Sequence, residues 1–227
     1  MTPLDPPGYR RPAGRHHRRS IRLKGYNYTQ PGAYFISICT QDRWHVFGEV
    51  VEGEMRLNAF GEIVRDEWFK TAQIRPYVQL WDDEFVVMPN HVHGIIWIFG
   101  DDVGATRRVA PTPTPDAPTK PHGPIPQSIG AIIGQFKSVV TKRVNELRGT
   151  PGAVIWQRNY YERIIRDERA LDAIRHYIAE NPLRWHLDRH NDRATGADPL
   201  AREVWQMMHV GTSHASPLPD HQPEDLP

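Results

Sequence analysis

The chain has 227 residues, and its 28 Lys and Arg against 27 Asp and Glu leave a formal net charge of +1. This length predicts one sizeable domain with tails, and the balanced charge by itself indicates no partner. The single cysteine, Cys39, excludes a disulfide framework within the chain and is typical of a reducing cytoplasm, which is the location we predict. We find no signal-peptide pattern and no apolar run long enough to span a bilayer, so we expect no membrane association.

The hydrophobic pattern predicts strands and helices in a segregated order, which is typical of an α+β domain with a mainly antiparallel sheet. In chain order we expect strands at 33–40 and 46–51, a helix capped by Asn58, strands at 78–88 and 91–99, a proline-rich loop at 100–127, a helix at 128–147, a short strand at 154–156, and a helix that begins at Asp167 and ends at Asn181, before Pro182. Residues 26–190 therefore form the predicted domain. Residues 1–25 are a basic arm, and residues 191–227 are a tail that becomes acidic and proline-rich.

Basic side chains gather in two places that suit a polyanion, because Lys and Arg neutralise phosphates. We take as candidate DNA contacts Arg18, Arg19 and Arg22 of the arm, and Lys137, Lys142 and Arg143 on the polar side of the helix at 128–147. From charge alone, a solvated terminus is an equally good explanation of the arm.

Two histidines, His91 and His93, open the strand at 91–99. Residues i and i+2 of a strand point to the same face, so their imidazoles lie side by side. Imidazole is a common ligand of divalent metals, but two ligands need a third. For a bare His-x-His motif, the alternative of two ordinary histidines with ordinary hydrogen bonds is favoured.

The helix that begins at Asp167 offers the missing groups. Tyr177 and Asn181 are four residues apart and share one helix face, beside the apolar Ile174 and Ile178. A tyrosine hydroxyl can act as a nucleophile, and the Asn181 amide oxygen can act as a third ligand. The alternatives are a core tyrosine and an ordinary helix-end asparagine.

Three blocks resemble a known family in the same order. Residues 88–93 (MPNHVH) resemble the HUH motif of single-tyrosine transposases, residues 156–168 (WQRNYYERIIRDE) resemble the block before their nucleophile helix, and residues 176–182 (HYIAENP) resemble the end of that helix. The combination is similar to the REP-associated tyrosine transposases, and the resemblance runs from about residue 20 to about residue 185.

The resemblance implies a ferredoxin-like antiparallel β-sheet with packed helices, the HUH nuclease fold. It implies that His91, His93 and Asn181 bind Mg²⁺ or Mn²⁺ and that Tyr177 attacks a phosphodiester of single-stranded hairpin DNA. The products would be a 5′-phosphotyrosine adduct and a free 3′-hydroxyl, as in DNA transposition. Within this family a monomer is favoured, with a dimer as the alternative.

Other readings stay open at this point. A relative that binds hairpin DNA without cleaving it would keep the same blocks. A metallohydrolase would need further ligands, and His122, His176, His186 and His190 form no evident second cluster, so we interpret residues 186–190 as a polar segment. The adjacent Tyr160 and Tyr161 are rival nucleophiles, but we prefer Tyr177 because of its helical partner.

Overall fold

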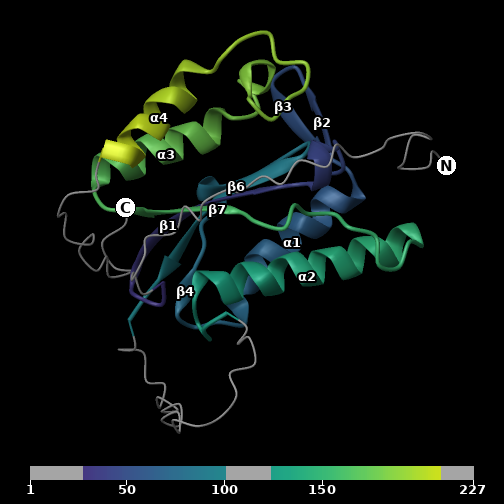
Figure 1. The fold of residues 1–227 in the computed structure, drawn as a ribbon, viewed down its shortest axis with the longest axis horizontal. Helices are drawn as coiled ribbons and strands as arrows, with labels where there is room; N and C mark the ends of the chain where they lie inside the picture. The colour runs from purple at the N-terminus through teal and green to yellow at the C-terminus, as the bar shows by residue number, and fades with distance from the viewer. Residues whose placement is uncertain (1–27, 101–123, 211–227) are drawn as a thin grey trace, which may run out of the picture.

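The computed structural model describes residues 28–100 and 124–210. The predicted basic arm, with Arg18, Arg19 and Arg22, therefore lies outside the described residues, as does most of the proline-rich loop at 100–127. Figure 1 shows a sheet with helices on both of its faces. The predicted class, α+β with a ferredoxin-like antiparallel sheet and packed helices, is confirmed.

The main sheet has five strands, all paired antiparallel, in the order β4-β6-β1-β7, and β5 also pairs with β6. These strands are β1 (Gly32–Cys39), β4 (Val78–Gln79), β5 (Phe85–Met88), β6 (His91–Ile98) and β7 (Tyr161–Ile165). A separate hairpin joins β2 (Gly48–Val51) to β3 (Glu54–Leu57). The long central pair β1 and β6 sets the register of the sheet, with Cys39 opposite His91 and Ser37 opposite His93.

One face of the sheet is covered by α1 (Ala59–Gln73) and α2 (Ile129–Arg148). Both helices begin at the residues that the sequence predicts. The Asn58 side chain accepts hydrogen bonds from two backbone N–H groups of α1, and Ser128 accepts one from α2. The core on this face combines apolar residues of both helices with alternate residues of the strands, such as Ile36 and Ile96.

The opposite face is covered by α3 (Glu168–Glu180) and α4 (Pro199–Val210). The Asp167 side chain caps α3, which buries Leu171, Ile174 and Ile178. This second core contains the strand residues Phe35, Ile95 and Trp97. Because His91 and His93 have the same parity along β6 as Ile95 and Trp97, both imidazoles point into the α3 layer.

The structure differs from the sequence prediction in several elements, and it adds the strands β3 and β7, which the sequence analysis does not predict. The segment expected as a tail, residues 191–227, contains α4, whose Val204 and Met208 are buried. Asp198 supports the helix start, because its side chain accepts from the Leu200 N–H and from Arg184. Residues 78–88 are two strands rather than one, because three consecutive acidic residues form the 3-10 helix η2 (Asp82–Glu84). Residues 154–156 contribute a single bridge, between Thr40 and Trp156.

The chain has two further 3-10 helices among the described residues, η1 (Gln41–Arg43), which follows β1, and η3 (Trp185–Leu187), which follows α3. Within the described part of the chain, none of the helices combines the length and the apolar character that a bilayer crossing requires.

Candidate metal and nucleophile site

Strand β6 holds both histidines in the interior of the protein. His91 and His93 are each 0% exposed, and their ring centroids lie 4.6 Å apart. All eight residues of β6 are buried, since the strand is central in the sheet and covered on both faces. The strand therefore fixes the two imidazoles as neighbours on one face, as the His-x-His spacing predicts.

Asn90 determines which nitrogen of His91 carries the proton. Its Nδ2 donates to the carbonyl oxygens of Arg43, at 2.9 Å, and His190, at 2.8 Å, so its Oδ1 must be the atom that faces His91 Nδ1, at 2.9 Å. An amide oxygen only accepts, so His91 Nδ1 donates to it. The lone pair of His91 therefore sits on Nε2, a buried atom with no hydrogen-bond partner among the described residues.

His93 has one satisfied nitrogen and one unsatisfied nitrogen as well. Its Nε2 lies 3.2 Å from the Tyr177 hydroxyl, and its Nδ1 is buried without a partner in the described structure. The ring stacks on Phe35 with centroids 5.5 Å apart, which fixes its plane. Burial holds the pKa of His93 well below its ordinary value and lowers the pKa of His91 to about 3, so both rings are neutral at pH 7.

Helix α3 delivers Tyr177 and Asn181 to the histidines, as their spacing predicts. Tyr177 is 3% exposed and Asn181 is 2% exposed. The Asn181 Oδ1 atom is buried and makes no hydrogen bond to the described residues. Burial raises the pKa of Tyr177 above its ordinary value and the Asp188 carboxylate adds to this rise, whereas the Asn181 side chain acts in the opposite direction. The phenol is therefore protonated and needs a cation nearby to ionise.

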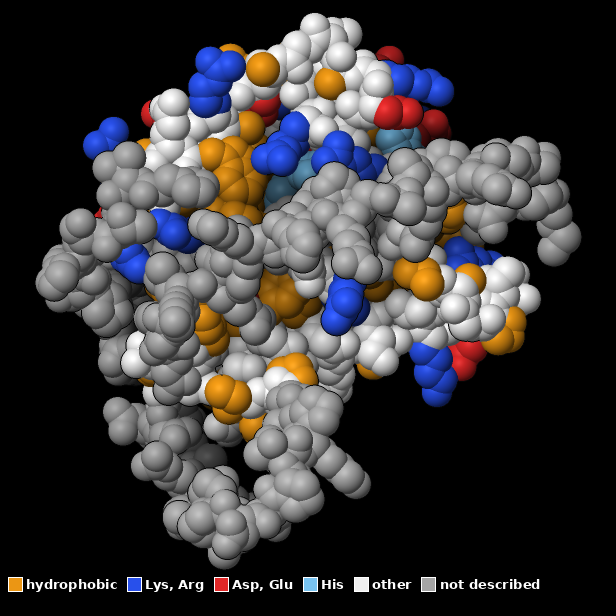
Figure 2. All heavy atoms as spheres, viewed as in Figure 1, with side chains coloured by type: hydrophobic (Ala, Val, Ile, Leu, Met, Phe, Trp, Pro, Cys, Tyr) orange, Lys and Arg blue, Asp and Glu red, His pale blue; other side chains and the backbone are white. Residues whose placement is uncertain are grey.

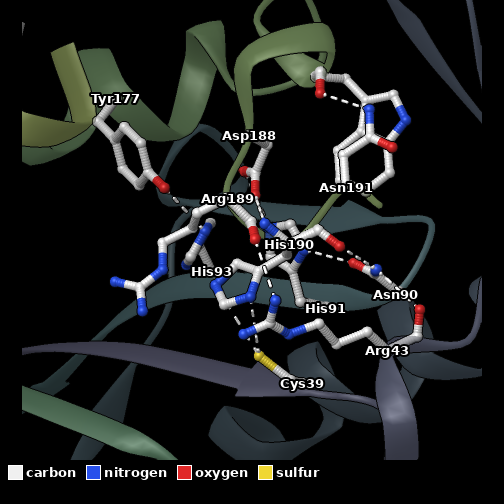
Figure 3. Close-up of polar contacts among 11 residues, drawn as sticks. Cys39, Arg43, Asn90, His91, His93, Tyr177, Asp188, Arg189, His190 and Asn191 are labelled. Carbon is white, nitrogen blue, oxygen red and sulfur yellow. Dashed lines mark hydrogen bonds and ion pairs between the residues drawn. The ribbon is translucent and has the colours of Figure 1, made fainter. Parts of the chain in front are cut away.

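The segment that follows α3 contributes two groups that the sequence analysis missed. Asp188 is 5% exposed, and its Oδ2 lies 3.7 Å from His91 Nε2. The His190 ring lies 4.8 Å from the His91 ring, centroid to centroid, and its Nδ1 lies 3.7 Å from the Cys39 sulfur. The sequence analysis interprets residues 186–190 as a polar segment and selects neither group, whereas Figure 3 shows Asp188 and His190 beside His91. The Asp-x-His spacing is a possible ligand signal, but only the fold brings it to His91.

One ligand atom each from His91, His93 and Asp188 lies within 4.8 Å of the other two. This set supplies two neutral imidazole nitrogens and one carboxylate oxygen. Burial is the main influence on the pKa of His91 and lowers it, and the Asn181 side chain acts against this, so Asn181 lies near the same cluster. Mixed nitrogen and oxygen ligands suit Mn²⁺, and the oxygens also suit Mg²⁺. The unsatisfied buried atoms fit a divalent cation, which would give each of them a partner.

The basic residues of α2 do not join this cluster. Lys142 and Arg143 lie on the helix that covers the other face of the sheet, where Arg143 pairs with Glu67 at 2.6 Å and Lys142 lies 3.9 Å from Glu146. The Lys137 ammonium group donates to the backbone carbonyls of Gln157 and Arg158. Burial lowers the pKa of Lys137 to about 8. Their role as DNA contacts stays a prediction.

Arg43 and Arg189, which the sequence analysis did not select, lie at the cluster instead (Figure 3). Arg43, in η1, donates from Nη1 to the backbone oxygen of Arg189, at 3.1 Å. Arg43 has a φ of 59° and its neighbour Asp42 has a φ of 53°, a conformation that costs non-glycine residues energy. Figure 2 shows Lys and Arg side chains next to histidine side chains in the upper half of this face of the molecule.

Comparison with known proteins gives one close relative by sequence. An uncharacterized protein of Haemophilus influenzae (strain Rd) is 42% identical over 176 residues, which is 78% of this chain and 94% of that protein. No protein-family model matches the chain. Among solved structures, a REP-associated tyrosine transposase bound to a REP hairpin is similar, with 17% identity and a TM-score of 0.46, over 79% of this chain and 90% of that chain.

Proposed function

We propose that this chain, which belongs to the same protein family as the Haemophilus influenzae protein, is a metal-dependent endonuclease and strand transferase of single-stranded hairpin DNA, of the DNA transposition type. One observation carries the proposal. One buried ligand atom each from His91, His93 and Asp188 lies within 4.8 Å of the other two, and the Tyr177 hydroxyl lies 3.2 Å from His93 Nε2. His91 Nε2, His93 Nδ1 and Asn181 Oδ1 are also buried without hydrogen-bond partners in the described structure, and because unsatisfied polar atoms are costly in a core, they favour a binding site over ordinary packing.

The proposed metal ligands are His91 and His93 with an oxygen from Asn181 or Asp188. The sequence resemblance favours Asn181, while the 3.7 Å approach of Asp188 to His91 adds a charged oxygen. When bound, Mg²⁺ or Mn²⁺ would polarise a phosphate oxygen and offset charge that develops in the reaction. Asn90 would act behind His91, because its hydrogen bond to Nδ1 keeps the Nε2 lone pair available.

In the proposed reaction the Tyr177 oxygen attacks the phosphorus of a phosphodiester. A bond forms between that oxygen and phosphorus, and the bond from phosphorus to the 3′ oxygen breaks. The phenol loses its proton, and the leaving oxygen gains one to become the free 3′-hydroxyl. The 5′ phosphate stays on Tyr177 as a phosphotyrosine, which the 3′-hydroxyl of another strand can attack in the reverse sense.

His93 would orient the nucleophile rather than store its proton. Burial disfavours the imidazolium form, as the low pKa of His93 indicates. With the proton on Nε2, the ring donates to the Tyr177 oxygen at 3.2 Å and leaves Nδ1 free as a ligand. Such a donor stabilises the phenolate during attack.

A second function, hairpin binding without cleavage, is favoured by one observation, namely that Tyr177 is only 3% exposed. Cleavage requires that a phosphate reach this hydroxyl, whereas binding does not. We propose a monomer acting on single-stranded hairpin DNA, since the described residues supply the nucleophile and the candidate ligands from one chain.

The test is covalent capture of DNA. A labelled single-stranded hairpin oligonucleotide is incubated with the protein and Mn²⁺ and separated under denaturing conditions. We expect a protein–DNA adduct that Tyr177→Phe abolishes, while Tyr160→Phe and Tyr161→Phe retain it. If Tyr160→Phe or Tyr161→Phe abolishes the adduct instead, that tyrosine is the nucleophile and the assignment of Tyr177 is wrong. Tight hairpin binding with no adduct for the unmodified chain would support the second function.

A further inference from the structure

Residues 188–190 form a short segment whose side chains alternate between the interior and the surface. Asp188 and His190 turn toward His91, whereas Arg189 between them is exposed. Three hydrogen bonds fix the backbone: Arg43 Nη1 to the Arg189 oxygen at 3.1 Å, Asn90 Nδ2 to the His190 oxygen at 2.8 Å, and the His190 N–H to Asp188 Oδ1 at 2.6 Å. The hydrogen bonds from Arg43 and Asn90 therefore fix the backbone position from which the Arg189 side chain extends.

The Arg189 side chain is held by an aromatic surface of α4. Its Cζ atom lies 5.7 Å from the ring centroid of Trp205, within the range of a cation–π contact. Trp205 in turn meets Tyr161 of β7 edge to face, with centroids 4.4 Å apart. A guanidinium held by its flat face keeps its N–H edges available for oxygen acceptors. Among the described residues, Arg189 forms no ion pair with a carboxylate.

The side chain also lies on the side of the cluster where Tyr177 presents its hydroxyl. Figure 3 shows Arg189 extending past His93, with the Tyr177 hydroxyl beside the same ring. Burial is the main influence on the pKa of Tyr177 and raises it, and the positive charge of Arg189 acts against that rise. Figure 3 therefore places Arg189 on the Tyr177 side of His93.

We propose that Arg189, held against Trp205, binds a non-bridging oxygen of the DNA phosphate that Tyr177 attacks. This inference rests on the proposed function and names the group that would hold the phosphate opposite the metal ligands. Phosphate carries two non-bridging oxygens, and a guanidinium fork matches them with charge-assisted hydrogen bonds. Because attack adds charge to these oxygens, the same contact would strengthen in the transition state. α4 thereby gains a role, since Trp205 positions the arginine.

The first part of the test measures DNA binding without metal. A fluorescein-labelled hairpin oligonucleotide with a single-stranded extension is titrated in EDTA at several salt concentrations, in a Tyr177→Phe background. Arg189→Gln should lower the affinity and reduce the slope of log K against log salt by about 0.7, the value for one phosphate contact on a single strand. Arg202→Gln, on an exposed position of α4, makes the same charge change and should leave the slope unchanged.

The second part measures the rate of adduct formation at saturating DNA with Mn²⁺. Arg189→Gln should slow the step by about 100-fold, as for loss of one transition-state donor. Arg189→Lys should restore the salt slope but little of the rate, because an ammonium group lacks the fork. Trp205→Leu should lower the rate while the charge remains.

The two proposals fail in different ways. An unchanged salt slope in Arg189→Gln would overturn the inference even if Tyr177 forms the adduct. An unchanged rate with a reduced slope would also overturn it, because Arg189 would then contact a phosphate other than the one attacked. If the unmodified chain forms no adduct, the proposed function fails. The inference then fails with it, even if Arg189→Gln reduces the slope, because no phosphate is attacked by Tyr177.

Discussion

Replacing Asn90 by alanine is the most informative perturbation of the candidate site, because one side chain supports three partners. Asn90 is 0% exposed and bonds to His91 Nδ1 and to the backbone oxygens of Arg43 and His190. At about 1 kcal/mol for each net hydrogen bond, Asn90→Ala should lower the free energy of unfolding by about 3 kcal/mol. Because the proton of His91 is then free to move to Nε2, the affinity for Mn²⁺ should fall by about 10- to 100-fold.

The assay combines urea unfolding with calorimetric titration of Mn²⁺ into the folded protein, so that stability and metal affinity are separated. Asn145→Ala is the matched control. Asn145 is 5% exposed in α2, donates to the Ala153 oxygen at 2.8 Å and accepts from Arg148 at 2.9 Å, away from the histidines. It should lose about 2 kcal/mol of stability and keep its Mn²⁺ affinity. Equal Mn²⁺ affinities for Asn90→Ala and the unmodified protein would refute the role assigned to Asn90.

Two further predictions concern stability. Burial lowers the pKa of His91 to about 3 in the folded protein, against 6.5 in the unfolded chain. Only the unfolded chain therefore takes up a proton as the pH falls below 6.5, and by pH 5 the metal-free protein should lose about 2 kcal/mol of its free energy of unfolding from this group. Equal stability in urea at pH 7 and pH 5 would contradict this. In Gly94→Ala the new Cβ would lie 2.5 Å from Trp68 Cζ2 and 2.9 Å from Phe85 Cδ2, which should cost about 1–3 kcal/mol. The control Gly134→Ala, in α2 with nothing within 4 Å, should instead gain about 0.5–1 kcal/mol, and thermal unfolding of both variants measures the difference.

Local signals explain why much of the fold could be predicted. The caps Asn58 and Asp167 accept hydrogen bonds from the first turns of their helices, as their residue types indicate. Local signals also indicate the pairing of His91 with His93 and of Tyr177 with Asn181. Strand parity fixes the direction of the two histidines, and helical spacing fixes the common face of the other two residues. Only their mutual approach required the fold.

The remaining parts of the site depend on contacts that no local pattern encodes. Asp188 and His190 follow Pro182 in a stretch without periodicity, and they reach His91 because the Asn90 amide bonds the His190 backbone 100 residues away. α4 does carry a local signal in Asp198 and in the apolar spacing that includes Val204 and Met208. The acidic, proline-rich composition of the end of the chain obscured that signal. The charge pattern of α2 does not reveal which face of the sheet the helix covers, and the DNA contacts assigned to it stay a prediction.

The geometry also bears on the alternative that a bare His-x-His leaves open. An ordinary core histidine satisfies both ring nitrogens, because a buried polar atom without a partner costs about 1–3 kcal/mol. Here each of the two rings satisfies one nitrogen only, and the fold keeps the other nitrogen buried without a partner among the described residues, as it also keeps the Asn181 Oδ1 atom. Packing alone gives no reason to leave three such atoms without partners. A ligand that accepts lone pairs from all three does, because its binding would recover the energy that folding leaves unpaired.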